Sequence, residues 1–455
     1  MMEQAPLGLG KRGYALMIAI AAALGGLLFG YDTSVISGAI LFLRQQFHLT
    51  SVETEVAVGI VLAGAAMGAG FAGFFGDRYG RKPVLIFNAI LFGIFAVVTG
   101  MANGLALFLA ARFVVGLAVG MTSMLTPLYI AELAPPKIRG ALVTLNQLAI
   151  VTGIVVAYYV DYLFSGSSNW RAMFISAVIP SVILLVALFF LPESPRWLVV
   201  RQRVDEAFRI LERVESTEDA RRHLEELQEV TEVDKLRFRD LFGERFKKPL
   251  LIGVGLAIFQ QITGVNAIIY YTPTILQMGG FKSASSAILA TVLVGGVNLV
   301  MTIVALFLLD RVGRRPLLLI GIAGMAISLT SLGYLFGATH VSRVAILTGV
   351  LVYLSCFAIG LGPIFWLLIS EIYPTTIRGQ AMSVASVTIW VSDLLVSVTF
   401  LSLIGAAGAR FCFWIYAAAS VAAFVFAFRL VPETKGRTLE EIEASWTDHA
   451  MSSVR

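Results

Sequence analysis

An acidic residue interrupts an apolar stretch near the start of the chain. The stretch reads FGYDTSVISG over residues 29–38, and its acid is Asp32. A basic residue, Arg112, interrupts a second apolar stretch, ARFVVGLAVG. A charge at the centre of a membrane helix costs about 2.5–3.5 kcal/mol on insertion scales, so such residues are functional candidates by default. The two residues form either a permanent ion pair between helices or an acid that takes up a proton and thereby releases the arginine.

The chain that holds these residues has the composition of a membrane protein. Of its 455 residues, 58% are hydrophobic and only 14% are charged. About twenty apolar residues cross a hydrocarbon core of about 30 Å as a helix. The sequence predicts an all-α integral membrane protein with twelve transmembrane helices. The predicted spans are 14–43, 54–76, 84–103, 105–130, 141–163, 172–191, 249–277, 284–309, 317–338, 344–370, 381–404 and 411–431.

The spans place the two charges at a similar depth. Asp32 lies eleven residues from the outer end of the first span, and Arg112 lies seven residues into the fourth. A helix rises about 1.5 Å per residue, so both residues fall in the outer half of the membrane. We therefore expect Asp32 and Arg112 to be partners.

Basic residues gather in alternate loops. Lysine and arginine are retained on the cytoplasmic side of membrane proteins, so this asymmetry predicts that both termini and the polar stretch 192–248 are cytoplasmic. The formal net charge of +5 is then a topology signal and gives no reason to expect a nucleic-acid partner. The partner that the composition does predict is the lipid bilayer.

Several classes of function lack the residues that they require. No GxxxxGK[ST] phosphate loop occurs, so ATP-driven transport would need another subunit. The four histidines lie in loops or tails without the spacing of metal ligands. No nucleophile and base share one membrane depth, and Cys356 and Cys412 fall inside predicted spans, where we interpret them as packing residues. We expect neither an enzyme nor a metal or cofactor site.

The second half of the chain repeats the first. Two six-helix halves related by duplication are typical of secondary transporters that hold their substrate between the halves. We predict halves at 1–191 and 249–455, and a cytoplasmic linker at 192–248 with two short amphipathic helices that lie against both halves. The repeated pairs, offset by 233, 239 and 240 residues, are GDRYGRKP (76–83) with LDRVGRRP (309–316), ELAPPKIRG (132–140) with EIYPTTIRG (371–379), and PESPR (192–196) with PETKG (432–436).

Taken together, these motifs resemble the sugar porters of the major facilitator superfamily, most closely the bacterial proton-coupled symporters for glucose, xylose and similar monosaccharides. The resemblance also rests on GYDTSVISGA (30–39), QQITGVNAIIYY (260–271) and GPIFWLLISEIYPTTIRG (362–379). It implies a monosaccharide importer, driven by proton symport through alternating access, that works as a monomer in the bacterial cytoplasmic membrane. A facilitative uniporter and a polyol–proton symporter are the alternatives, and a non-transporting sugar sensor is a further rival.

A sugar site needs neutral amides, which both donate and accept hydrogen bonds, and aromatic faces. Such residues lie on spans of both halves, although each alone could be interhelical glue worth about 0.6 kcal/mol. On a regular helix Gln260 and Asn266 would point about 240° apart, so we expect the helix to be interrupted at Thr263 and Gly264, and likewise near Gly360. By resemblance, the sugar-contacting residues are Gln147, Gln260, Gln261, Asn266, Asn298 and Trp366, with Phe29, Tyr270, Gly362 and Trp390 lining the same cavity.

Three positions depart from the pattern of the family. Ile389 and Ile154 replace amides that the sugar porters usually have, which removes two hydrogen-bonding partners for a sugar. Asp393, in WVSDLL, stands where the family commonly has asparagine. It is interpreted as a second titrating site, a ligand for a more polar substrate, or an acid kept neutral by burial, and the last is preferred because no basic partner is evident.

Matched charges mark the predicted cytoplasmic ends of the spans. Orientation in the membrane requires positive charge, and it does not explain why glutamates are repeated as well. We predict a cytoplasmic gate of salt bridges across the two halves that closes this side and breaks when the carrier opens inward. Its residues are Arg81, Glu132, Arg139 and Glu193, mirrored by Arg314, Glu371, Arg378 and Glu433.

Overall fold

Every regular element in the described part of the chain is a helix. The computed structural model describes residues 9–135, 138–232, 241–339, 342–374 and 377–435. Twelve helical segments there are long and apolar enough to cross a membrane, and they match the twelve predicted spans to within a few residues. The fold class predicted from the sequence is therefore confirmed. Before the linker come α1 Leu9–Gln46, α2 Ser51–Tyr79, α3 Arg81–Gly100, α4 Leu105–Leu133, α5 Arg139–Ser165, α6 Trp170–Ile175 and α7 Val178–Phe190.

Several spans are broken into two helices. The sixth consists of α6 and α7, the seventh of α11 and α12, the tenth of α15 and α16, and the eleventh of α17 and α18. After the linker helices α8 Pro195–Val200, α9 Val204–Val214 and α10 Thr217–Glu232 come α11 Glu244–Ile262, α12 Val265–Met278, α13 Ala284–Val312, α14 Arg314–Phe336, α15 Arg343–Ile359, α16 Leu361–Ile372, α17 Arg378–Ser397, α18 Phe400–Ala407 and α19 Ala409–Leu430.

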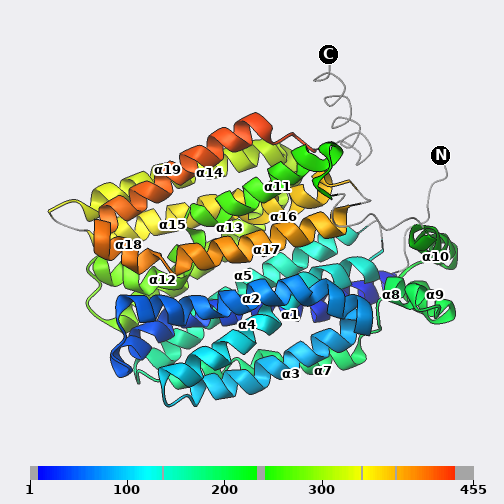
Figure 1. The fold of residues 1–455 in the computed structure, drawn as a ribbon, viewed down its shortest axis with the longest axis horizontal. Coiled ribbons are helices and arrows are strands. Elements are labelled where there is room, and N and C mark those ends of the chain that lie inside the picture. Colours follow the sequence, from blue (N-terminus) through cyan, green and yellow to red (C-terminus); the bar gives the residue numbers. More distant parts are fainter. Residues whose placement is uncertain (1–8, 136–137, 233–240, 340–341, 375–376, 436–455) are drawn as a thin grey trace.

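The helices before and after the linker gather on two sides of the bundle. Figure 1 shows α1 to α5 and α7 on one side and α11 to α19 on the other, with their axes roughly parallel. Helices α8 to α10 extend from one end of this bundle. We call that end the linker end and the opposite one the distal end, where the turns between α1 and α2 and between α18 and α19 lie.

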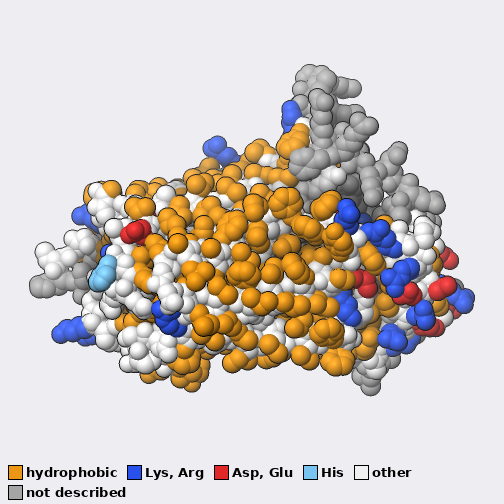
Figure 2. All heavy atoms as spheres, turned by 60° about the horizontal axis from the view of Figure 1, so that its bottom comes forward, with side chains coloured by type: hydrophobic (Ala, Val, Ile, Leu, Met, Phe, Trp, Pro, Cys, Tyr) orange, Lys and Arg blue, Asp and Glu red, His pale blue; other side chains and the backbone are white. Residues whose placement is uncertain are grey.

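The surface of the bundle suits a bilayer. Hydrophobic side chains cover the middle of the face in Figure 2, and charged side chains gather toward its two ends, more densely at the linker end. Large apolar side chains such as Phe190, Phe307 and Ile327 are well exposed. In helices the backbone polar groups are bonded within the segment, so these apolar surfaces can face lipid without cost.

Small residues allow the helices to approach closely. A side-chain carbon added at Gly116 of α4 would lie 2.1 Å from the Val61 carbonyl oxygen of α2, and one at Gly120 would lie 2.0 Å from that of Ala65. Close backbone approach at small residues is the usual way in which membrane helices associate, because lipid supplies no hydrophobic force between them. Helices α2 and α4 of the first half are packed in this manner.

The linker helices form where the apolar spacing predicted them, at Val204–Val214 and Thr217–Glu232. Their described hydrogen bonds to the bundle go to the first half. Lys11 Nζ donates to the carbonyl oxygens of Glu212 and Glu215 at 2.8 and 2.5 Å, and Trp197 Nε1 donates to that of Asp77 at 3.0 Å. That the linker lies against both halves stays a prediction.

Candidate transport site

Asp32 and Arg112 form a buried ion pair between α1 and α4. Arg112 Nη1 lies 2.7 Å from Asp32 Oδ1, and Arg112 Nη2 donates to the backbone oxygen of Asp32 at 3.2 Å. Their side chains are 1% and 4% exposed, and the guanidinium lies 5.2 Å from the centroid of the Phe174 ring. Asp32 Oδ2 is buried without a hydrogen-bond partner among the described residues. The pair expected from matching depths is present, and one acid oxygen is left available for a proton.

The seventh span is interrupted at Gly264, as the sequence predicted. Helix α11 ends at Ile262 and α12 begins at Val265, and Gly264 between them has a φ of +91°. Such a backbone conformation favours glycine, which has no Cβ to clash. The interruption changes the direction of the side chains that follow, so that Asn266 comes within hydrogen-bonding distance of Gln261.

The amides of this broken span join one hydrogen-bonded chain. Gln260 Nε2 donates to the Leu361 carbonyl oxygen of α16 at 3.1 Å, and Gln261 Nε2 lies 3.5 Å from Gln260 Oε1. Asn266 Nδ2 then donates to Gln261 Oε1 at 3.0 Å. The chain orients three amides that the sequence assigned to the sugar site.

Asp393 of α17 ends that chain. Its Oδ2 accepts hydrogen bonds from Asn266 Nδ2 at 2.7 Å and from the Tyr270 hydroxyl at 3.0 Å, and its Oδ1 accepts one from Ser397 Oγ at 3.0 Å. The amide nitrogen can only donate. If the acid carries a proton, that proton therefore resides on Oδ1. No lysine, arginine or histidine among the described residues forms a salt bridge with Asp393.

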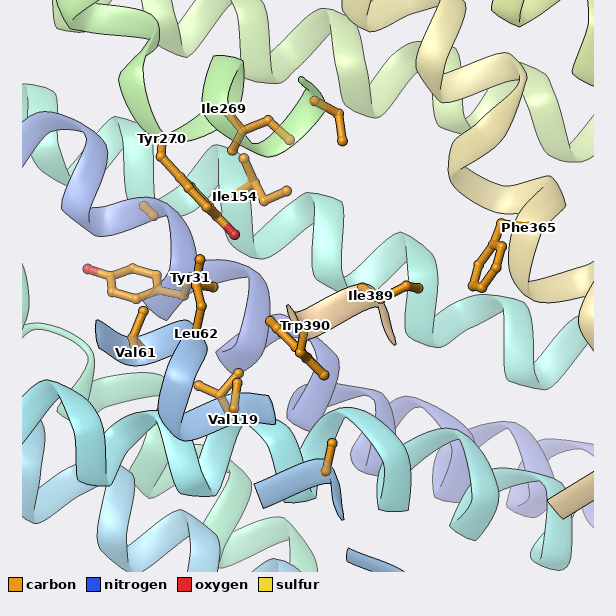
Figure 3. Close-up of a cluster of buried hydrophobic side chains, with 14 of the residues drawn as sticks. Tyr31, Val61, Leu62, Val119, Ile154, Ile269, Tyr270, Phe365, Ile389 and Trp390 are labelled. Carbon is orange, nitrogen blue, oxygen red and sulfur yellow. The ribbon is translucent and has the colours of Figure 1, made fainter. Parts of the chain in front are cut away.

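Aromatic residues predicted to line the sugar cavity come together from both halves. The rings of Phe29 on α1 and Trp390 on α17 lie 5.3 Å apart between centroids, across the two halves. Figure 3 shows Tyr270 on α12, Ile154 on α5 and Trp390 on α17 in one interior cluster, with Ile389 nearby. Ile154 and Ile389 are buried, so the two positions that depart from the family pattern add apolar surface to this region.

Three further predicted residues lie on α5, α13 and α16. Gln147 is half-buried, Asn298 is buried, and neither side-chain amide is hydrogen-bonded to another described residue. Trp366 is half-buried and follows a second interruption at Gly360, which ends α15 and begins α16. Gly362 is buried one turn before it. Amides without a protein partner are what a polyhydroxylated ligand requires.

Charged residues at the linker end pair inside each half. In the first half, Arg81 forms two hydrogen bonds to Glu132, from Nε at 2.9 Å and from Nη2 at 3.0 Å. Glu193 Oε1 accepts from the backbone N–H groups of Arg81, Lys82 and Ser194. The gate of salt bridges across the halves, which would break when the carrier opens inward, stays a prediction.

The second half repeats this arrangement. Arg314 Nη2 lies 3.2 Å from Glu371 Oε1, and Glu433 accepts from the backbone N–H groups of Arg314 and Arg315 at 3.1 Å each. The glycines before the two arginines, Gly80 and Gly313, have nearly equal φ values of 101° and 106°. The repeated motifs therefore encode a repeated local structure.

The two remaining residues of the predicted gate are Arg139 and Arg378. Arg139 begins α5, and burial lowers the pKa of its guanidinium, while the charges of Glu215, Glu226 and Glu132 raise it. Its Nε is buried without a hydrogen-bond partner among the described residues. Arg378 begins α17, and its side chain lies outside what the structure describes. Burial also raises the pKa of the Glu193 carboxyl, against the neighbouring N–H groups that lower it.

Two hydrogen-bonded contacts across the halves lie at the distal end, where we made no prediction from the sequence. Glu55 of α2 is 1% exposed, and its carboxylate accepts from Ser402 N at 2.7 Å and from Ser402 Oγ at 2.5 Å. Ser165 Oγ lies 3.0 Å from Ser285 Oγ. Glu55 stands one residue inside the second predicted span, where we did not distinguish it from an ordinary boundary charge.

A cavity of about 510 Å³ lies at the distal end, apart from the predicted sugar residues. It is bordered by the ends of α1 and α12, the start of α2 and a residue of α18. Its polar lining comprises Arg44, Gln45, His48, Thr54, Thr274 and Gln277. Because these residues belong to both halves, the cavity lies between the halves.

A twelve-helix membrane protein with a buried acid–arginine pair and a chain of amides between two repeated halves has the features of a secondary transporter. The chain belongs to the family described as "Sugar (and other) transporter", whose model matches residues 18–446. It is a multi-pass membrane protein whose relatives transport metabolites and are not enzymes.

Similar proteins cover nearly the whole chain. A putative metabolite transport protein of Bacillus subtilis, YwtG, is 41% identical over 94% of both chains. The galactose-proton symporter of Escherichia coli strain K12 is 37% identical over 96% of this chain and 95% of its own length. Among solved structures, the proton:xylose symporter XylE bound to 6-bromo-6-deoxy-D-glucose aligns with a TM-score of 0.83 at 36% identity, covering 95% of this chain and 99% of the other.

Proposed function

We propose that this protein imports a monosaccharide together with a proton. The observation that carries the proposal is the buried Asp32–Arg112 pair, in which Asp32 Oδ2 has no partner among the described residues. Protonating Asp32 removes its negative charge, which weakens the ion pair and leaves Arg112 with its backbone contact. An intramembrane acid whose charge state changes an interhelical contact can couple a proton to a conformational change.

The energy available from one proton suits active uptake. Moving one charge down about 100 mV gives roughly 2.3 kcal/mol, and one pH unit adds about 1.4 kcal/mol. The two together correspond to several-hundredfold accumulation of the sugar. A permanent ion pair would leave this energy unused, and the protein would then be a facilitative uniporter.

The substrate we propose is glucose, with xylose and galactose as alternatives. The amides of Gln260, Gln261 and Asn266 are held in one chain, and those of Gln147 and Asn298 remain open to a ligand. The galactose and xylose symporters named above are about equally identical to this chain. Overall sequence identity therefore does not distinguish between these sugars. We propose that the preference depends on Ile154, Ile389 and Asp393, the three positions that depart from the family pattern.

A polyol is the second candidate, and Asp393 is the observation that favours it. Its carboxylate sits among predicted sugar residues and accepts from Asn266 and Tyr270. A carboxylate accepts hydrogen bonds from hydroxyls more strongly than an amide does, which suits a ligand with many free hydroxyls. Competition of labelled glucose uptake by mannitol, sorbitol and inositol distinguishes the two. A polyol that competes better than any monosaccharide would replace the glucose assignment.

Transport is proposed to proceed by alternating access in a monomer. The described contacts across the halves at the distal end, from Glu55 and Ser165, close that end. Toward the linker end, the described hydrogen bond across the halves is a weak one, from Ser383 Oγ to the Met124 sulfur at 3.8 Å. We propose that the linker end faces the cytoplasm of a bacterial cell, because the basic loops lie there. The structure then represents a state closed to the outside.

The test is uptake into proteoliposomes. We expect purified wild-type protein to accumulate labelled glucose or xylose when an inward proton gradient is imposed, and only to equilibrate it otherwise. Asp32→Asn keeps the shape of the side chain and removes its charge, so it should lose accumulation and retain counterflow. Wild-type uptake that ignores the gradient would show a uniporter. Asp32→Asn that still accumulates sugar would show that the proton binds elsewhere.

A further inference from the structure

A second acid is buried in the first half and takes no part in the site described above. Asp161 of α5 is fully buried. Its Oδ2 accepts one hydrogen bond, from the backbone N–H of Gly38 on α1 at 3.0 Å, and its Oδ1 has no hydrogen-bond partner among the described residues. No described lysine, arginine or histidine forms a salt bridge with it. It lies in a membrane span, where an acid is a functional candidate for the same reason as Asp32.

Close packing fixes the position of this acid against α1. A side-chain carbon added at Gly38 would lie 2.6 Å from both Cβ and Oδ2 of Asp161. Glycine at that position is therefore required for the contact. Gly38 follows Asp32 by six residues on the same helix, which places Asp161 about 9 Å nearer the distal end than Asp32.

Two buried hydroxyl groups lie on α1 between the positions of Asp32 and Gly38 along the helix. Ser34 and Ser37 of α1 are both fully buried. The Ser37 hydroxyl has no hydrogen-bond partner among the described residues, and the Ser34 hydroxyl lies near the Tyr158 hydroxyl of α5 without meeting the geometry of a full hydrogen bond. Ser34 and Gly38 are four residues apart, so they share the face of α1 that meets α5. Asp161 Oδ1, the two hydroxyls and Asp32 Oδ2 are four buried polar atoms with unused hydrogen-bonding capacity on one pair of helices. Buried polar groups in native proteins are nearly always satisfied, by water where no protein group serves.

We propose that Asp161 is a second proton-binding residue and that protons reach Asp32 from the distal end along Ser37 and Ser34, between α1 and α5. A proton that enters from the outside binds Asp161, is passed through the hydroxyls and the water that they hold, and is taken up by Asp32. Asp161 then regains a proton from outside, so that no net charge stays on the path. This inference rests on the proposed proton symport.

The side chains that we identify around Asp161 are neutral tyrosines, which do not supply a counter-ion for its carboxylate. Tyr31 of α1 lies within the electrostatic reach of both Asp161 and Asp32, and Tyr158 of α5 lies within that of Asp161. The Tyr31 hydroxyl is bonded to Ser176 Oγ at 2.6 Å, and the Tyr158 hydroxyl donates to the Ile269 carbonyl oxygen at 2.9 Å.

The charged residues on the helices packed against α5 either bind other groups or lie at the linker end. On α4, Arg112 binds Asp32. On α6, Arg171 donates to the backbone oxygens of Gly100 and Ala102. On α13, the charged residues Asp310 and Arg311 lie at the linker end of the helix. On α5 itself, Tyr162 is half-buried one residue beyond Asp161. A proton is thus the cation that these surroundings leave for Asp161 to bind.

The variant Asp161→Asn tests the proposal in proteoliposomes, because the amide keeps the shape of the acid and cannot exchange a proton. Two readouts are compared, counterflow of labelled glucose or xylose and uptake driven by an inward proton gradient at several external pH values. We expect counterflow within twofold of the wild type. Proton-driven uptake should fall about tenfold, the equivalent of one pH unit in proton binding, and depend less steeply on pH. Asp205→Asn, an exposed acid on α9, is the matched control and should match the wild type in both.

Each other outcome overturns the proposal. Proton-driven uptake by Asp161→Asn with the rate and pH dependence of the wild type would make Asp161 a structural acid. Loss of counterflow as well would assign it to sugar binding or folding. A sodium gradient that drives wild-type uptake but not uptake by Asp161→Asn would identify a metal cation in place of the proton. Failure of the wild type itself to respond to pH would instead refute the symport on which the inference rests.

A second variant tests the path without removing the acid. Ser34→Ala combined with Ser37→Ala removes both hydroxyls and little volume. We expect a smaller fall in proton-driven uptake than in Asp161→Asn, with counterflow unchanged. Proton-driven uptake equal to that of the wild type would show that the proton does not pass these serines.

Discussion

The two ends of the bundle use their buried carboxylates differently. At the distal end, Glu55 of the first half accepts two hydrogen bonds from Ser402 of the second. At the linker end, Glu132 binds Arg81 and Glu371 binds Arg314, each inside its own half. The same type of side chain thus joins the halves at one end and consolidates each half at the other.

This difference separates the contacts that a transport cycle must break from those that it can keep. Alternating access, as proposed here, moves one half against the other around a fixed site. The Glu55–Ser402 contact must open when the distal end opens. The arginine–glutamate pairs can stay intact throughout, because their partners move together as one half. Substitutions at the linker end should therefore change the stability of the fold, and substitutions at the distal end should change the balance between its open and closed states.

The largest effect is expected from Arg81→Gln at the linker end. Removing the guanidinium leaves Glu132, whose side chain is 5% exposed, without its two charged hydrogen bonds. Breaking a buried ion pair by removing one partner costs about 3–5 kcal/mol. We expect a large fall in the thermal unfolding midpoint of the purified protein, with little change in the balance between its open and closed states.

Two arginines serve as controls for that variant. Arg78 lies three residues earlier, in the last turn of α2, and it is exposed, so Arg78→Gln should leave the unfolding midpoint nearly unchanged. Arg314→Gln should cost less than Arg81→Gln, because the side chains of Arg314 and Glu371 are 15% and 20% exposed. If Arg81→Gln opened the distal end while keeping the midpoint of the wild type, the comparison of the two ends would be wrong.

The next effect is expected from Glu55→Gln at the distal end. The amide can no longer offer two charged acceptor oxygens to Ser402, and a hydrogen bond to a charged group is worth about 1.5–3 kcal/mol. The population open at the distal end should therefore rise about tenfold or more. Electron–electron distance measurements between spin labels at Asn103 and Gly405, with Cys356 and Cys412 replaced, report the separation of the halves there.

The neighbouring acid Glu53 is the matched control. It lies two residues earlier on α2, and its Oε2 accepts from Thr50 N and Thr50 Oγ1, within the same half. Glu53→Gln removes the same charge at the same end and leaves the contact between the halves intact. We expect the distance distribution of the wild type. Equal shifts in the two variants would mean that charge near the distal end matters, and not the contact with Ser402.

The sequence was sufficient for features that depend on distance along one helix. Apolar length located the twelve spans, because a helix must cover the hydrocarbon with satisfied backbone groups. Residue counts from the span ends placed Asp32 opposite Arg112, and the contact is present. The interruption at Gly264 was also predictable along one helix, since two amides about two-thirds of a turn out of phase cannot share a ligand on a regular helix.

Features that depend on which surfaces meet were missed. Duplication showed that Glu132 and Glu371 are matched, but a repeated motif is equally compatible with pairing inside a half and across the halves. Asp161 lies in YVDYLF within a predicted span, and the rule applied to Asp32 would have found it. Its contact with Gly38 depends on how closely α1 and α5 approach, which spacing in the sequence does not reveal.

The smallest effect is the difference in thermal unfolding midpoint that we expect between Glu193→Gln and Glu433→Gln. These two glutamates cap the repeated helices. Glu193 receives its three backbone N–H groups on Oε1 alone, so Glu193→Gln can keep all three on the amide oxygen. Burial already raises the pKa of the Glu193 carboxyl, so a neutral side chain also avoids part of the cost of burying a charge. Glu433 uses both oxygens, with Oε2 accepting from Arg315 N.

In Glu433→Gln one amide N–H₂ would therefore face the N–H of Arg315, and a donor left unsatisfied costs about 1–3 kcal/mol when buried. Both caps are partly exposed, which favours the lower figure. We expect Glu433→Gln to lower the thermal unfolding midpoint more than Glu193→Gln, and neither to change the separation of the halves at the distal end. Equal midpoints would show that the two caps tolerate an amide alike, whereas a change at the distal end would mean that these linker-end caps also sense the opposite half.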